Sequence, residues 1–430
     1  MSPWTSVSRR DFLASSTAAV LGTSLGPLSA WADAKKPPRI LLRSSWQTVN
    51  IGDIGHTPGI LALLERHLPG AEVTLWAAGV NAEVEVMLRR RFPKVPIITG
   101  GLIDAKGDPN TAELSAAFER MGLFLHGSGP NVVSPEGLAL SRRMGKPYGV
   151  YGVSIAGVND DMVGLLSGSA FVFCRDTDSL AYLKQRGVTC PVMEFGPDAA
   201  FGIDVRDEER AGAFMKAHEL EDRRFICTVP RLRYTPYHKM RKVSTDPAEI
   251  RRREAVNEQF AEADHEKLRE VITAWVHETG LKALVCPEMT YQVEVGKRLL
   301  VDPLPDDVKR RVVHRDSFWL PDEAGSVYAR AHTVVSIEMH SPIIAMAMGT
   351  PMLHLRQPTD GRKGQMMRDI GLADWLFELD ASTGRQIADA LLKIHADYPA
   401  AQEKLKNAMS FVRQHQAETM AVVAKAVRAA

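Results

Sequence analysis

The sequence has 430 residues, of which 45% are hydrophobic and 24% are charged, and its formal net charge is +1. These proportions are typical of a globular protein and exclude a chain that is disordered over most of its length. The balanced charge also argues against a nucleic-acid binder that works through bulk positive charge. The four cysteines include no CxxC pair, which excludes the common thiolate zinc sites and leaves one or two disulfides open.

The first 32 residues have the pattern of an export signal. Arg9 and Arg10 are followed by a run of small and apolar residues up to about Leu28, and a small-x-small cleavage pattern ends at Ala32. The paired arginines resemble the twin-arginine signal of bacteria. We expect export by the twin-arginine machinery, cleavage near Ala32 and a periplasmic mature protein. The alternative is an ordinary basic tail on a cytoplasmic enzyme.

Short apolar runs alternate with amphipathic stretches after this signal. The runs predict strands at residues 39–43, 73–77, 123–126, 149–153 and 171–174. Helices are predicted between them, including residues 57–67, where Thr57 and Pro58 form a typical helix start, and residues 83–92. This alternation indicates a parallel, doubly wound α/β sheet.

The same alternation starts again near residue 225. Strands are predicted at residues 225–229, 282–286, 311–314, 333–337 and 352–355, and helices at residues 262–279, 341–348, 364–370 and 385–429. We therefore predict two Rossmann-like domains, residues 39–205 and 222–400, that face each other across a cleft, followed by a C-terminal helix at 401–430. No later stretch reaches about 18 uninterrupted apolar residues, so we expect no membrane span in the mature chain.

Ligands of such sheets bind beyond the carboxyl ends of the strands, which selects a few segments. Asn50, Asp53 and His56 lie in a glycine-containing segment after the first strand, where they could bind a hydroxyl-rich substrate. A turn capped by its own side chains explains them equally well. Gly127 and Gly129 follow the strand at 123–126; they are substrate-binding candidates, although packing explains such glycines more often.

The second predicted domain supplies charged candidates at its strand ends. Arg231 directly follows the strand at 225–229 and could hold an anionic substrate, as could Lys363 before a later helix. Glu338 and His340 close the strand at 333–337 and, two residues apart in extended backbone, would point into one cleft. A carboxylate beside His340 would raise its pKa and favour a proton donor. We predict His340 and Glu338 as the catalytic residues.

Several short motifs occur in an order that resembles a known family. The motifs are the Asn-x-Gly-Asp segment at residues 50–53, the glycine-rich turn at 127–129, Arg-Asp-x-x-Ser at 175–179, Asp-x-Ala-Phe at 198–201, and a tail from residue 339 to 372. Each motif is weak alone, but together and in order they resemble the polysaccharide pyruvyl transferase family over roughly residues 39–380.

The resemblance implies a GT-B-like pair of Rossmann-like domains and a specific chemistry. Members of the family transfer the carboxyethylidene group of phosphoenolpyruvate to sugar hydroxyls. In this chain His340 would be the acid–base group, Arg231 and Lys363 would hold the anionic donor, and Asn50 and Asp53 would line the acceptor side. The expected partners are a polysaccharide or oligosaccharide acceptor and an anionic small-molecule donor, with no bound cofactor and no metal.

Two features depart from that family. It usually carries Arg-x-His where this chain has Glu338-Met339-His340, which reverses a charge where the anionic donor should lie. Phosphoenolpyruvate is also a cytoplasmic metabolite, which an exported enzyme would not normally meet. Both features suggest a different donor or none.

Four functions therefore stay open. The leading one is a transferase that acts on an envelope or exported glycan. The second is a periplasmic glycan-modifying hydrolase that uses Glu338 beside His340, and the third is a non-catalytic glycan-binding protein. The fourth, a metal site made by Glu338 and His340, is disfavoured because the spacing reveals no third ligand.

Overall fold

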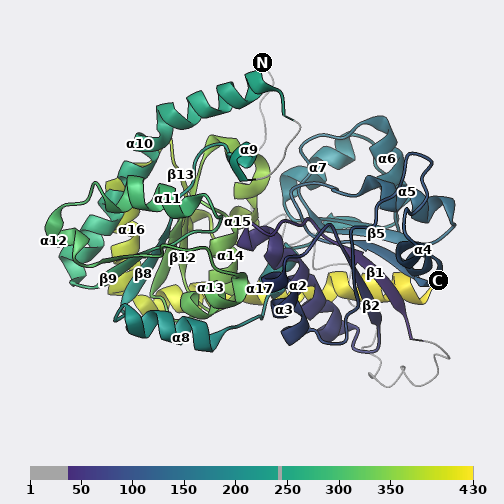
Figure 1. The fold of residues 1–430 in the computed structure, drawn as a ribbon, viewed down its shortest axis with the longest axis horizontal. Helices are drawn as coiled ribbons and strands as arrows, with labels where there is room; N and C mark the ends of the chain where they lie inside the picture. The colour runs from purple at the N-terminus through teal and green to yellow at the C-terminus, as the bar shows by residue number, and fades with distance from the viewer. Residues whose placement is uncertain (1–36, 241–244, 430) are drawn as a thin grey trace, which may run out of the picture. The chain divides into compact units, whose positions relative to one another are not determined.

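The computed structural model describes residues 37–240 and 245–429, and those from Pro38 onward form one compact unit. The predicted export signal lies outside the described residues. Two sheets organise this unit, and every strand pairing in both is parallel. Their strands are drawn in purple to teal and in teal to green, respectively, in Figure 1.

The first sheet has seven strands in the order β3-β2-β1-β4-β5-β6-β7. They are β1 (Arg39–Arg43), β2 (Glu72–Ala77), β3 (Ile97–Thr99), β4 (Leu123–His126), β5 (Tyr148–Val153), β6 (Phe171–Cys174) and β7 (Met193–Phe195). The helical segments of this half are α2 (Ile51–His67), α3 (Ala82–Arg91), α4 (Ala112–Arg120), α5 (Pro135–Arg143), α6 (Asp160–Ser167), α7 (Thr177–Gln185), η2 (Ala199–Gly202) and α8 (Glu208–Ala217).

The second sheet has six strands in the order β10-β9-β8-β11-β12-β13. They are β8 (Phe225–Val229), β9 (Lys282–Val285), β10 (Val312–His314), β11 (Thr333–Ser336), β12 (Met352–Arg356) and β13 (Leu376–Glu378). The helical segments are α9 (Tyr237–Met240), α10 (Pro247–Thr279), α11 (Gln292–Gly296), η3 (Lys297–Val301), α12 (Asp306–Lys309), α13 (Pro321–Tyr328), α14 (His340–Ala347), η4 (Pro358–Gly364), α15 (Gln365–Asp369), η5 (Ala373–Trp375), α16 (Gly384–Ala396) and α17 (Tyr398–Arg428).

The central strands are buried on both faces because helices cover both sides of each sheet. All residues of β4, β6, β8 and β11 are buried, which explains why these strands read as continuous apolar runs. The predicted fold class, two doubly wound α/β sheets, is confirmed. The predicted domain limits stay a prediction, since the contacts do not divide the unit between the sheets.

Helix α2 begins earlier than the sequence pattern predicts. Thr57 and Pro58 look like a helix start, but Pro58 lies inside the helix, and Asn50 is the capping residue. The Asn50 side chain accepts hydrogen bonds from the backbone N–H groups of Gly52 and Asp53, which begins the helix at Ile51. Asp53 and His56 therefore lie on the first two turns of a buried helix rather than in a loop.

Helix α17 returns from the second half of the chain to the first. It packs against α2 and β6, and the hydroxyl groups of Tyr151 and Thr419 are 3.0 Å apart. The helix predicted at residues 385–429 is divided at Asp397 into α16 and α17, and Pro399 lies in the first turn of α17. In the described part of the chain no helix is long and apolar enough to cross a bilayer. The four cysteines are free thiols, so neither disulfide left open by the sequence is formed.

Candidate active site

Most of the predicted site residues follow the two central strands of each sheet. Strands β1 and β4 are neighbours at the point where the strand order of the first sheet reverses, and β8 and β11 occupy the same place in the second. Ligands of open parallel sheets bind outside the carboxyl ends at such points. Each predicted residue except Lys363, which follows β12, comes after one of these four strands: Asn50, Asp53, His56, Gly127, Gly129, Arg231, Glu338 and His340.

The imidazole of His340 lies against the first turns of α2. His340 is the first residue of α14, and its Nε2 atom is 3.0 Å from Nε2 of His56, with the two rings edge to face. A Cβ atom on Gly52 would come within 2.4 Å of the His340 ring, so only glycine leaves room for it. The structure thus brings together two predicted residues that are 284 positions apart.

Two buried carboxylates flank this pair of histidines. Asp198 Oδ2 is 3.5 Å from His56 Nε2 and 3.8 Å from His340 Nε2, and Glu288 Oε1 is 3.5 Å from His340 Nδ1. Burial alone would lower the pKa of His340, but Asp198 and Glu288 outweigh it and raise that pKa to about 9. Burial lowers the pKa of His56. At neutral pH the His340 ring is therefore protonated on both nitrogens and cationic, and its Nε2–H donates to the ring of His56, which is neutral.

Further polar groups fix these two carboxylates. Ser341 donates to Glu288 Oε2 from its backbone N–H at 2.6 Å and from its hydroxyl at 2.8 Å. Arg175 donates from Nη1 to Asp198 and from Nε to Ser154, and the side chains of Arg175 and Asp198 are 0% exposed. Although burial would raise the pKa of Asp198, His56 and Arg175 hold it well below its usual range. Asp198 is therefore a buried anion on which both halves of the chain converge.

Replacing His340 by glutamine is expected to remove a pH-dependent part of the stability. Because the pKa of His340 is higher in the folded protein than in the unfolded chain, protonation of His340 stabilises the fold. This contribution to the free energy of unfolding is complete below pH 6.5 and is lost as the pH rises through about 9. At 1.36 kcal/mol per pH unit, the loss amounts to roughly 3 kcal/mol. Urea titrations should show that the free energy of unfolding falls less in His340→Gln than in the unmodified protein over this range.

The control for this experiment is His332→Gln. Burial lowers the pKa of His332 to about 4, so this histidine is uncharged over the whole range and its variant should keep the original slope. An unchanged slope in His340→Gln would show that the ring does not titrate between Asp198 and Glu288.

A second charged cluster surrounds Glu338. Its Oε1 accepts a hydrogen bond from Gln292 at 2.6 Å, and its Oε2 lies 3.3 Å from Nε of Arg231. Arg231 also forms an ion pair with Asp360. Burial raises the pKa of Glu338 to about 7, and repulsion from Glu288 and Asp360 adds to this, while Arg231 and Lys363 oppose it. Near neutral pH, Glu338 can therefore both accept and release a proton.

Glu338 and His340 do not form the pair that the sequence predicts. Strand β11 ends at Ser336 and Met339 already has helical backbone angles, so the two side chains do not alternate along extended backbone. The carboxylates that raise the His340 pKa are Asp198 and Glu288. Glu338 instead belongs to the cluster of Arg231 and Asp360. The pKa of His340 is raised, as the sequence predicts, but Asp198 and Glu288 cause the shift instead of Glu338.

The remaining predicted residues have structural contacts. The Asn50 side chain caps α2, and Asp53 accepts a hydrogen bond from Gln47 at 2.6 Å. Gly127 and Gly129 pack against serines: an added Cβ would come within 2.2 Å of Ser44 and 2.6 Å of Ser45, respectively. These contacts favour packing as the reason for both glycines. Their predicted role in substrate binding stays a prediction.

Sequence reasoning did not assign roles to several residues of the two clusters. Arg175 and Asp198 lie within the motifs that resemble the family, but only their order along the chain was used. Glu288 follows strand β9, so the rule that sites form at carboxyl ends could have found it. Asp360 follows strand β12, so the same rule could have found it. In the structure it is buried beside Arg231.

His56, Asp198 and His340 could also hold a metal ion, since their ligand atoms lie within 4.8 Å of one another. Glu338, which the sequence suggested as a ligand beside His340, is not part of this set. The proton on His340 would have to leave before a metal could bind, and the two carboxylates that raise its pKa oppose that loss. A metal ion and the His340 proton would therefore compete for this position.

The predicted cleft is almost closed at the two clusters. The exposed fraction of the side chain is 7% for His340, 8% for Glu338 and 9% for Arg231. Backbone hydrogen bonds join the two halves nearby, from Ile51 N–H to Glu288 and from Thr290 N–H to Val49. These three side chains therefore keep only a small exposed surface.

A family comparison agrees with the order of the motifs. The model of the family described as "polysaccharide pyruvyl transferase" matches residues 85–357, which is more than half of the chain. The chain belongs to the polysaccharide pyruvyl transferase family. The matched region of this pyruvyl transferase family member includes Asp198, Glu288, Glu338 and His340. No curated protein matches the sequence.

Solved structures show the fold of this pyruvyl transferase family member. It resembles Anabaena HepE in complex with UDP and glucose (12% identity, TM-score 0.53, covering 92% of this chain and 100% of that one). It also resembles UDP-N-acetylglucosamine 2-epimerases from Rickettsia bellii (11%, 0.53, 91% and 98%) and Neisseria meningitidis (10%, 0.51, 88% and 99%). These similarities establish the GT-B-like fold.

Proposed function

We propose that this protein transfers a carboxyethylidene group, or a closely related group, from an anionic donor to hydroxyls of an envelope or exported polysaccharide. The family membership supports a transferase. The observation that carries the proposal is the pair of raised pKa values, about 9 for His340 and about 7 for Glu338. Between these two values, His340 holds its proton and Glu338 has largely lost its own, so the site contains one acid and one base.

The two groups match the proton transfers of such a reaction. With an enol phosphate donor, Glu338 would take the proton of the attacking sugar hydroxyl as its oxygen bonds to the central carbon. His340 would deliver a proton to the methylene carbon of the donor. A second hydroxyl would then displace phosphate from the same carbon and give its proton to His340, which is neutral after the first step, and this closes the ketal.

The charges around Glu338 bear on the identity of the donor. Arg231 and Lys363 are the two cations proposed to hold the donor. Their positive charges are offset by the carboxylates of Glu338 and Asp360. Glu338 stands where the family usually has arginine, and one such reversal near 4 Å is worth several kcal/mol at an effective dielectric of about 20. We propose a donor with less negative charge than phosphoenolpyruvate. A periplasmic location would agree, because phosphoenolpyruvate is cytoplasmic.

The test uses the full-length protein, a series of donors and polysaccharide from envelope preparations. Phosphoenolpyruvate, its methyl ester and nucleotide-linked sugars are compared by thermal shift, and the polysaccharide is analysed by mass spectrometry. We expect the melting temperature to rise most with the least charged enol phosphate. We expect the glycan to gain the mass of the group that the donor carries, which is one carboxyethylidene group from phosphoenolpyruvate and its methyl ester from the esterified donor. Neither a thermal shift nor a mass gain with any donor would refute the transferase proposal.

A hydrolase is the second candidate, because a carboxyl group with a pKa of about 7 also suits a general acid. It predicts that the same glycan loses a small acid or a sugar without any donor. Retention of the glycan without any turnover would instead identify a binding protein.

We also propose that the protein is exported to the periplasm by the twin-arginine pathway. The support is the paired arginines Arg9 and Arg10 with the cleavage pattern that ends at Ala32. Cell fractionation of an Arg9→Lys/Arg10→Lys double variant tests this proposal, since an unchanged periplasmic fraction would contradict it.

A further inference from the structure

Three buried side chains at the histidine pair present the ligand atoms of a metal ion. They are His56 in α2, Asp198 directly before η2, and His340 at the start of α14. Across residues 37–240 and 245–429, this is the one set of three histidine, cysteine or carboxylate groups whose ligand atoms lie close enough to share an ion. Two imidazoles and a carboxylate form a ligand set that zinc uses in catalytic sites.

The separations of the three ligand atoms fit the bond lengths of zinc. Nε2 of His56 and Nε2 of His340 are 3.0 Å apart, and Asp198 Oδ2 is 3.5 Å from the first and 3.8 Å from the second. The circle through three points with these separations has a radius of about 2.0 Å. An ion close to its centre would therefore lie about 2.0 to 2.1 Å from all three atoms, which is the length of Zn–N and Zn–O bonds.

The same separations favour a tetrahedral ion over an octahedral one. With bonds of about 2.1 Å, neighbouring ligands are about 3.0 Å apart around an octahedral ion and about 3.4 Å apart around a tetrahedral one. Both distances to Asp198 exceed the octahedral spacing. The rings of His56 and His340 meet edge to face with centroids 4.8 Å apart, so they do not point straight at each other, which leaves room for an ion beside the line between the two nitrogens.

The groups behind these ligands are those that metal sites use. Glu288 Oε1 lies 3.5 Å from Nδ1 of His340, the ring nitrogen that the ion would leave free. Asp198 accepts hydrogen bonds from Nη1 of Arg175 and from the backbone N–H of Ala200. A carboxylate behind a metal-binding histidine fixes its ring and makes the other nitrogen a better ligand, and ligating carboxylates are themselves hydrogen-bonded. These contacts hold the ligand atoms of His340 and Asp198 in position.

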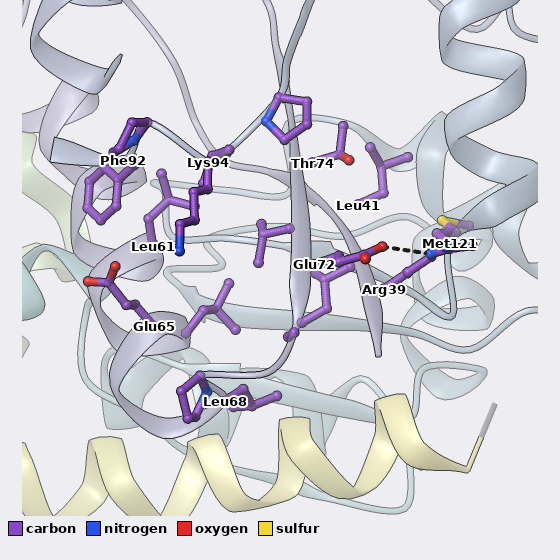
Figure 2. A pocket seen from close by; sticks show the side chains of 18 of the residues that line it. Arg39, Leu41, Leu61, Glu65, Leu68, Glu72, Thr74, Phe92, Lys94 and Met121 are labelled. Carbon is purple, nitrogen blue, oxygen red and sulfur yellow. Dashed lines mark hydrogen bonds and ion pairs between the residues drawn. The ribbon is translucent and has the colours of Figure 1, made fainter. Parts of the chain in front are cut away.

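A hollow of about 880 Å³ at the amino ends of β1 and β2 offers no comparable set (Figure 2). Its lining residues, all in the described part of the chain, include no histidine, cysteine or aspartate. Its two glutamates are paired with arginines, Glu72 with Arg39 and Glu65 with Arg91. The three proposed ligands follow the carboxyl ends of strands instead, where open parallel sheets bind their ligands.

We propose that His56, Asp198 and His340 form a zinc site with one open position, which water or a substrate oxygen would fill. The open position follows from three protein ligands on a four-coordinate ion. Since Nε2 of His340 cannot hold both a metal ion and a proton, bound zinc would block proton delivery to the donor. This inhibition rests on the proposed function, whereas the site itself does not.

Titration calorimetry with zinc sulfate, on full-length protein stripped of metal by a chelator, tests the site without any donor or glycan. We expect one Zn²⁺ per chain and a melting temperature that rises with the zinc concentration. Co²⁺ in place of Zn²⁺ reports the geometry, since tetrahedral Co²⁺ absorbs visible light much more strongly than octahedral Co²⁺. Failure of the unmodified protein to bind zinc, or an octahedral cobalt spectrum, would overturn the proposal.

Variants of the ligands locate the ion. His56→Gln and Asp198→Asn each remove one ligand with little change in volume. Each should weaken zinc binding by more than about 100-fold, because even a contact behind a ligand is worth about 10- to 100-fold in affinity. Glu288→Gln keeps all three ligands but removes the charge behind His340, so it should weaken binding by about 10- to 100-fold with one ion still bound.

The control variant is His332→Gln. His332 forms a second histidine pair, with its Nε2 atom 3.3 Å from Nδ1 of His395, but this pair has no third ligand among the described residues. The Kd for zinc should therefore be unchanged. Circular dichroism shows whether each variant is folded. A folded His56→Gln or Asp198→Asn variant with the original Kd would refute the site, as would an equal loss of affinity in His332→Gln.

The transfer assay tests the inhibition separately. Zinc above its Kd should stop the transfer, and a chelator should restore it. Full activity with the site occupied would contradict the inhibition. Absence of transfer both with and without zinc would count against the proposed function, while the calorimetry would still decide whether the zinc site exists.

Discussion

Replacing Arg175 by methionine is expected to lower the free energy of unfolding by about 3 to 5 kcal/mol. Arg175 forms an ion pair with Asp198, and neither side chain is exposed. The methionine would fill a similar volume but would leave a buried carboxylate that only the two histidines could neutralise. Removing one partner of a buried pair costs far more than the pair contributes, because the other charge stays out of water.

Urea unfolding curves followed by circular dichroism measure this loss. Arg186→Met is the matched control, because Arg186 pairs with Asp160 on the surface, where such a pair is worth about 0 to 1 kcal/mol. The double variant Arg175→Met/Asp198→Asn has no unpaired buried charge. Its loss of unfolding free energy should therefore be smaller than the sum of the losses in the single variants Arg175→Met and Asp198→Asn. Equal losses in Arg175→Met and Arg186→Met would show that the buried pair is not formed.

Much of the fold could be predicted from the sequence because the central strands are buried on both faces. The limits of β1, β4, β6 and β8 agree with the predicted limits. The strands that were not predicted are β3, β7 and β13, which have three residues each and lie at the sheet edges. An edge strand is covered on fewer sides, so it lacks the continuous apolar run that identifies a central strand.

The site could be predicted only in part. The topology rule places His56 and His340 at strand ends, but it does not show that the two rings meet across 284 residues. The carboxylates Asp198 and Glu288 decide the charge of His340, and both come from segments whose distance to it depends on how the two halves pack. Local spacing therefore suggested Glu338 as the carboxylate beside His340. In the structure, tertiary contacts place Asp198 and Glu288 there instead.

Glutamine at position 338 or 340 is expected to lower kcat/KM of the transfer reaction by a factor of about 10² to 10⁴. The unmodified enzyme should be most active between pH 7 and pH 9, where Glu338 is ionised and His340 is protonated. Activity should fall below pH 7 as Glu338 gains a proton and above pH 9 as His340 loses one. The two limbs report the apparent pKa values of the pair of groups.

Each variant should remove a different limb of this profile. Glu338→Gln has no base that can be protonated, so its remaining activity should not decrease when the pH is lowered below 7. His340→Gln has no acid that can lose its proton, so its remaining activity should not decrease when the pH is raised above 9. Glu378→Gln removes a carboxylate at the end of β13 that pairs with Arg356 and Arg368, and this variant should keep both limbs. Because a structural defect would lower activity equally at every pH, a profile that keeps both limbs in Glu338→Gln and His340→Gln would exclude these residues from proton transfer.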